Sequence, residues 1–103
     1  MKQIERIKQM EAYLDASEKV IRQLSDALDM YEENQKALTK LFAYYGSTLW
    51  MKDYEDDEAG KFSPDLKRGV LSEDTVYNMI TDHHELILRM NRIITKAIEE
   101  KML

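Results

Sequence analysis

Residues 46–69 read GSTLWMKDYEDDEAGKFSPDLKRG and contain all three glycines and the single proline of this 103-residue chain. We call this stretch the insert. Glycine and proline interrupt helices, and the sequence on both sides of the insert has a helical hydrophobic pattern. The insert therefore predicts an all-α fold in which two long helices form an antiparallel hairpin and the chain reverses between them.

The stretch before the insert repeats apolar residues in a heptad pattern, and the stretch after it repeats them at steps of three and four. These patterns predict helices over about residues 2–45 and 73–100. Within the turn region we expect a short helix over about 48–58 and a loop over 59–71. The short helix should pack at the closed end of the hairpin as a third wall, which makes residues 1–103 a single helical domain.

Helix-terminating and capping residues mark the boundaries of these elements. Gly46 and Gly60 can end helices in the left-handed conformation, and Ser47 and Ser72 are suitable N-caps. Aromatic side chains should form the core at the closed end: Phe42, Tyr44, Tyr45, Trp50, Tyr54 and Phe62. The residues expected to have structural roles in this region are Gly46, Ser47, Trp50, Gly60, Gly69, Leu71 and Ser72.

Polar residues interrupt both apolar stripes. If residue 45 lies near residue 72 in an antiparallel hairpin, His83 faces Asn34 and has Gln35 beside it. Such a layer would satisfy the hydrogen bonds of its members and set the alignment of the two helices. We therefore expect Asn34, Gln35 and His83 to be structural.

The net charge of −5 is concentrated in one region, because residues 46–75 contain eight acidic and four basic residues. This acidic balance argues against binding to nucleic acid or to an anionic membrane surface. The chain has no cysteine, and its first residues resemble neither a signal peptide nor a transmembrane span. We expect a cytoplasmic protein.

Four consecutive carboxylates lie at the C-terminal end of the short helix, where the helix macrodipole disfavours negative charge. They are either an ordinary solvated surface that is partly neutralised by Lys61, Lys67 and Arg68, or a docking patch for a basic protein partner. A structural role is expected for Arg68 and a docking role for Glu55 and Asp56. The candidate partner surface comprises Asp53, Glu55, Asp56, Asp57, Glu58, Lys67 and Arg68.

No motif for catalysis, phosphate binding or metal binding is recognisable. His83 and His84 are adjacent, so their side chains point about 100° apart on a helix and do not readily chelate one ion. We predict no catalytic residues, no metal ligands and no cofactor. The alternative is a small enzyme or metal-binding protein that uses His83, His84 and the carboxylates of the insert.

The most distinctive residues lie in and beside the insert: Tyr45-Gly46-Ser47, Trp50, Asp53, Asp57-Glu58-Ala59-Gly60, and Leu66 to Asp74. With these residues the chain resembles the bacterial family catalogued as "domain of unknown function 4298", whose members are short helical proteins. The resemblance extends over the whole chain and implies a bacterial, cytoplasmic origin. It implies no catalytic residues.

The expected function is that of a non-catalytic protein that binds a protein partner or associates with itself. In the antiparallel alignment Ile4, Ile7 and Met10 lie beyond the last helix, and exposed apolar area of that kind usually marks an interface. We therefore predict a homodimer in which hairpins pair as a four-helix arrangement of coiled-coil type. A further alternative is an acidic inhibitor or immunity-type protein that occupies a basic surface.

Overall fold

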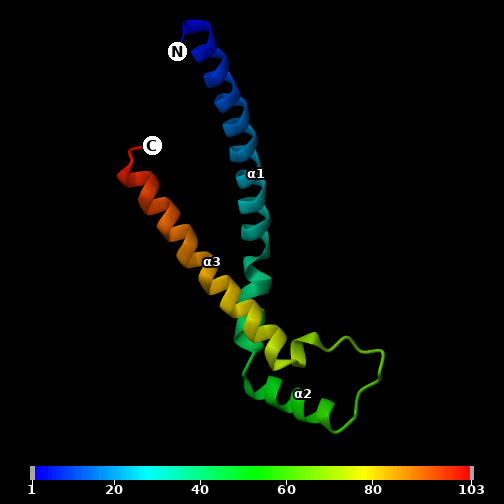
Figure 1. Ribbon diagram of the computed structural model, residues 1–103. Coiled ribbons are helices and arrows are strands. Elements are labelled where there is room, and N and C mark those ends of the chain that lie inside the picture. Colours follow the sequence, from blue (N-terminus) through cyan, green and yellow to red (C-terminus); the bar gives the residue numbers. More distant parts are fainter. Residues whose placement is uncertain (1, 103) are drawn as a thin grey trace. The chain divides into compact units, whose positions relative to one another are not determined.

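The computed structural model describes residues 2–102, in which every regular element is a helix and no strand occurs. Met1 and Leu103 lie outside the described residues. The elements follow in the order α1 (Gln3–Tyr44), α2 (Thr48–Glu58), the single 3-10 turn η1 (Gly69–Leu71) and α3 (Glu73–Glu99), as Figure 1 shows. Two long helices with a short helix between them fit the predicted hairpin.

The chain divides into two compact units on either side of the Thr39–Lys40 bond. The first unit contains only α1 up to Thr39. The second contains the last turn of α1 together with α2, η1 and α3. The prediction of a single domain stays a prediction.

Helix α1 is a continuous helix of 42 residues. It passes through the polar positions Asn34 and Gln35 without a break, and the Thr39 hydroxyl donates to the Gln35 carbonyl oxygen at 2.9 Å. None of the residues of α1 is buried. Helical periodicity and good helix formers therefore account for its secondary structure, whereas its own unit supplies no core for it to pack on.

The turn from α1 into α2 depends on Gly46 and Ser47. Gly46 adopts φ +78°, in the left-handed region that favours glycine. The Ser47 hydroxyl accepts a hydrogen bond from the Trp50 amide at 3.1 Å and so caps the start of α2. At the other end of α2, Gly60 has φ +72° and the chain leaves the helix.

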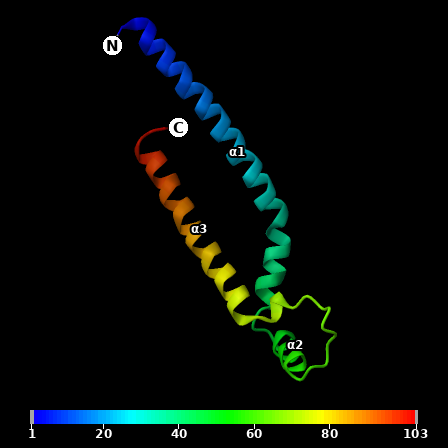
Figure 2. The same ribbon diagram turned by 45° about the vertical axis from the view of Figure 1, so that its right-hand side comes forward.

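The connection after α2 is a loop that ends in η1, and both views show it extending from α2 to the start of α3 (Figure 2). The sequence predicts a loop over residues 59–71, and its last three residues, Gly69–Leu71, form η1. The Leu71 amide donates to the Arg68 carbonyl at 3.0 Å, and the Ser72 amide donates to the Gly69 carbonyl at 3.1 Å. Gly69 therefore begins a 3-10 turn, and it does so without a positive φ.

Helix α3 begins at an N-cap formed by Ser72, whose hydroxyl accepts from the Thr75 amide at 3.4 Å. Glu73 and Asp74 occupy the first turn, where carboxylates complement the positive end of the helix dipole. Lys96 lies in the last turn, and Glu100 is the C-cap. The N-cap and the two carboxylates of the first turn favour the observed start of α3.

The core of the second unit is small. Among the described residues the buried apolar side chains are Trp50, Leu71 and Val76, which are 3%, 7% and 4% exposed. The Trp50 ring stacks on Tyr54 at a centroid distance of 5.3 Å and meets the edge of Tyr45 at 5.2 Å. The Trp50 indole N–H also donates to the Val70 carbonyl at 2.9 Å, which ties α2 to η1.

Two members of the predicted aromatic core lie elsewhere. Phe42 contacts His83 in an edge-to-face arrangement with centroids 5.5 Å apart, and Phe62 is half-buried beside Gly60 and Pro64. His83 thus has an aromatic neighbour from the last turn of α1. The predicted layer of Asn34, Gln35 and His83 stays a prediction, because its members belong to different units.

Candidate interaction surface

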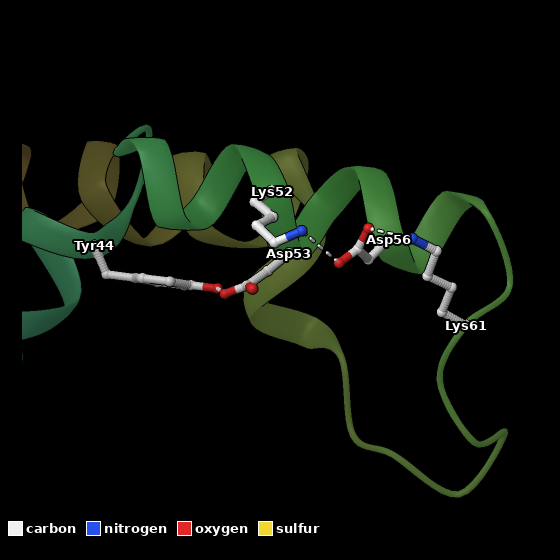
Figure 3. Close-up of polar contacts among 5 residues, drawn as sticks. All are labelled: Tyr44, Lys52, Asp53, Asp56 and Lys61. Atoms are coloured by element: carbon white, nitrogen blue, oxygen red, sulfur yellow. Dashed lines mark hydrogen bonds and ion pairs between the residues drawn. The ribbon is translucent and has the colours of Figure 1, made fainter.

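The acidic residues of α2 have different partners, although they follow one another closely in sequence. Asp53 faces back toward α1, where the Tyr44 hydroxyl donates to its Oδ2 at 2.6 Å (Figure 3). This hydrogen bond, together with the nearby negative charge, raises the pKa of Tyr44 to about 12. Asp53 therefore has an internal structural partner, and that partner is a tyrosine rather than a cation of the insert.

Asp56 lies between two lysines (Figure 3). Its Oδ1 is 3.1 Å from Lys61 Nζ, and its Oδ2 is 3.4 Å from Lys52 Nζ. The hydrogen bond from Lys61 is the main cause that lowers the pKa of Asp56, and Lys52 adds to it. A basic partner that docks on Asp56 has to compete with these two lysines.

Asp57 is paired with Arg68, as one of the two accounts of the insert predicts. Arg68 Nε lies 2.9 Å from Asp57 Oδ1, and Arg68 Nη2 donates to the Ser63 carbonyl at 2.7 Å. Arg68 thus joins the end of α2 to the middle of the loop. The structural role expected for Arg68 stays a prediction.

Three members of the candidate partner surface remain exposed, namely Glu55, Glu58 and Lys67. Glu58 is close enough to Tyr54 to raise the pKa of that phenol by charge repulsion. Glu58 also lines an open depression of about 380 Å³ to which Glu73, Asp74 and the ion pair of Asp57 with Arg68 contribute. The exposed negative charge of the insert is therefore continuous with the first turn of α3.

A second, apolar depression lies where the last turn of α1, η1 and α3 meet. Its volume is about 270 Å³. We call it the apolar groove, and it is lined by Leu41, Lys67, Gly69, Val70, Thr75, Val76 and Met79. Sequence reasoning missed this groove because its walls come from three separate segments. The apolar character of Val70, Val76 and Met79 was the only signal for it in the sequence.

Both long helices expose apolar side chains along one face. In α1 this exposed stripe contains Ile4, Ile7, Met10, Leu14, Ile21, Leu24 and Leu28, which are between 43% and 68% exposed. In α3 it contains Leu86, Ile87, Ile93, Ile94 and Ile98, which are between 39% and 57% exposed. Large apolar side chains in a continuous exposed row are the usual sign of an interface.

Two further features concern residues 2–102 alone. Within this range no three or more His, Cys, Asp or Glu side chains are grouped so that they could hold a metal ion. None of the helices in the same range is both long and apolar enough to cross a membrane.

The comparison with protein families agrees with the distinctive residues of the insert. The family model described as domain of unknown function (DUF4298) matches residues 7–93. This chain belongs to the DUF4298 family. The matched range includes α2, η1 and the apolar groove of this family member. No curated protein and no solved structure matches the chain.

Proposed function

We propose that this DUF4298 protein is a non-catalytic interaction protein that associates with itself as a homodimer through the apolar faces of its long helices. The observation that supports this proposal most directly is the exposed apolar stripe of α1, a helix without a single buried residue. In proteins most of the stability of an amphipathic helix comes from packing of its apolar face and not from helix propensity alone. The stripe therefore requires a covering surface.

Helix α3 can supply only part of that surface. It has 27 residues whereas α1 has 42, which corresponds to lengths of about 40 Å and about 63 Å at 1.5 Å per residue. In the antiparallel hairpin that we propose, with α2 at its closed end, about 15 residues of α1 extend past the end of α3. A second copy of the chain would cover them and complete a four-helix arrangement.

Light scattering coupled to size-exclusion chromatography tests this proposal. We expect a mass of about twice 12.2 kDa at high micromolar concentration. The double variant Ile7→Gln/Leu14→Gln should shift the equilibrium to the monomer. The control is Met30→Gln, which replaces a side chain that is 67% exposed but lies outside the stripe. A wild-type monomer at every concentration would refute the homodimer.

A second candidate function is supported by the open acidic depression. Glu58, Glu73 and Asp74 contribute carboxylates there, and Glu55 is exposed on the same helix as Glu58. A basic protein surface would complement this charge, as in an acidic inhibitor or immunity-type protein. The test is salt-sensitive binding to a basic partner that is lost in Glu55→Gln/Glu58→Gln and retained in the isosteric control Gln23→Glu.

A further inference from the structure

We propose that the apolar groove is occupied by the first turns of α1, residues 3–10, from a second copy of this chain. The inference rests on the homodimer proposed above and adds the surface and the orientation of the pairing. The exposed end of α1 in one copy meets the α1–η1–α3 junction of its partner, and the reverse contact occurs at the other end.

The groove has the chemistry of a site for an aliphatic side chain. Leu41, Val70, Val76 and Met79 line it, and no carboxylate does. A cavity of about 150 Å³ lined by apolar side chains already holds a benzene molecule, so about 270 Å³ is enough for an isoleucine or methionine side chain. Val76 is only 4% exposed, so the floor of the groove belongs to the packed core and is preformed.

The first turns of α1 present a matching row of side chains. Ile4, Ile7 and Met10 follow one another at three-residue steps, which places them on one face of the helix. They are 68%, 50% and 52% exposed. Recognition of a helix by an apolar groove uses anchors with this spacing.

Charge favours the same pairing. Residues 2–10 contain three basic residues and one acidic residue, whereas residues 46–75 contain eight acidic and four basic ones. The first turn of α3, which continues from the groove, contributes Glu73 and Asp74. The single acidic residue of the basic stretch, Glu5, also has an opposite charge available in Lys67, which lines the groove. Opposite net charges steer two surfaces together and disfavour wrong pairings.

Residues 3–10 of the same chain cannot be the occupant, because α1 is one continuous helix. Ile4 and Leu41 are 37 residues apart in α1, which corresponds to about 55 Å of helical rise. Residues 3–10 of a chain therefore cannot reach the groove at the other end of the same helix. A two-fold axis between two copies would fill both grooves at once in an antiparallel arrangement.

The absence of cysteine from the chain makes a site-directed crosslinking test direct. Full-length Ile4→Cys and Met79→Cys chains are mixed, refolded together and treated with a short bismaleimide. The control mixture pairs Ile4→Cys with Tyr77→Cys, because residue 77 points about 160° away from residue 79 around the helix. We expect about tenfold more crosslinked dimer from the first mixture than from the control, since the groove holds residue 4 close to residue 79.

Each outcome of this test has a distinct meaning. A light-scattering dimer without the crosslink between residues 4 and 79 overturns the inference but retains the homodimer. A crosslink between two Ile4→Cys chains indicates a parallel pairing and also overturns the inference. Equal crosslinking in the control mixture would mean that residue 4 contacts α3 without specificity, and it overturns the inference. A monomer overturns both proposals. If Met79→Cys fails to fold, Thr75→Cys offers the same test, because Thr75 lines the same groove and is exposed.

Discussion

The Tyr44 hydroxyl lies 2.6 Å from Asp53 Oδ2 and joins the last residue of α1 to the middle of α2. Between these two residues the chain passes Gly46 in a left-handed conformation and begins a new helix at Ser47. Glycine allows many directions at such a turn, so a side-chain contact across the turn restricts the choice. The Tyr44–Asp53 hydrogen bond therefore helps to set the angle between the last turn of α1 and α2.

Tyr44→Phe should lower the free energy of unfolding of the second unit by about 1.5–3 kcal/mol, since it removes a hydrogen bond to a charged group. Trp50 is the only tryptophan of the chain and lies in this unit, so its fluorescence during urea unfolding is the measurement. Tyr45→Phe is the control, because its hydroxyl is 3.5 Å from the Glu73 carbonyl and contributes a weaker contact. An equal loss in both variants would contradict the special role of Tyr44.

The same hydrogen bond predicts how stability depends on alkaline pH. The pKa of Tyr44 is raised from 10.0 to about 12 in the folded chain, so the unfolded chain loses this proton first as pH rises. The stability from this group is fully present below pH 10 and is lost between pH 10 and about 12. The free energy of unfolding, measured at several pH values in this range, should fall less steeply with pH for Tyr44→Phe than for the wild type. The same pH dependence in both proteins would contradict the raised pKa of Tyr44.

Trp50→Phe should lower the free energy of unfolding by about 1–3 kcal/mol, because it leaves the Val70 carbonyl without its donor inside the small core. Circular dichroism during urea unfolding measures this change without the tryptophan signal. Leu49→Ala in the same helix is the control, since Leu49 is 68% exposed and its loss should cost no more than about 0.5 kcal/mol. A similar cost for both variants would mean that the indole hydrogen bond contributes little.

The carboxylates of α2 should separate into two groups when pairs of them are neutralised. Asp56→Asn/Asp57→Asn breaks the ion pairs with Lys61, Lys52 and Arg68 and should lower the midpoint of thermal unfolding. Glu55→Gln/Glu58→Gln removes the same charge from exposed positions, and the midpoint should stay the same or rise as repulsion by the helix dipole is relieved. Equal midpoints would show that the ion pairs have no net effect.

The lowered pKa of Asp56 predicts how stability depends on acidic pH. Its pKa is lowered from 3.8 in the folded chain, so the stability that it contributes is present above pH 3.8 and is lost as pH falls through the lower folded value. The thermal midpoint of Asp56→Asn should therefore approach that of the wild type in this acidic range. A constant difference at every pH would contradict this expectation.

Charge reversal at the start of α1 should weaken dimerisation. Arg6→Glu/Lys8→Glu is expected to raise the dissociation constant about tenfold at low salt, with a smaller effect at high salt where the charges are screened. Lys19→Glu/Arg22→Glu changes the net charge of α1 equally but lies outside residues 3–10, so it serves as the control. Sedimentation at two salt concentrations is the measurement. Equal weakening by both pairs would point to overall charge instead of the groove.

The secondary structure was accessible from the sequence because its signals are local. Helix α1 covers Gln3–Tyr44 where periodicity indicated about residues 2–45, and α3 covers Glu73–Glu99 where it indicated 73–100. The hydroxyls of Ser47 and Ser72 accept hydrogen bonds from the amides three residues ahead. Such a cap lies within one short segment, so its signal is present in the local sequence. The family was also recognisable, since its distinctive residues lie close together in and beside the insert.

The sequence by itself therefore determined the all-helical class, the helix ends and the presence of an acidic insert. The tertiary structure decided which partner each carboxylate has. Asp53, Asp56 and Asp57 are the same residue type within five positions, yet they bind a tyrosine, two lysines and an arginine in turn. Pairing depends on distances between segments that only the folded chain brings together, and η1 and the apolar groove arise from the same long-range contacts.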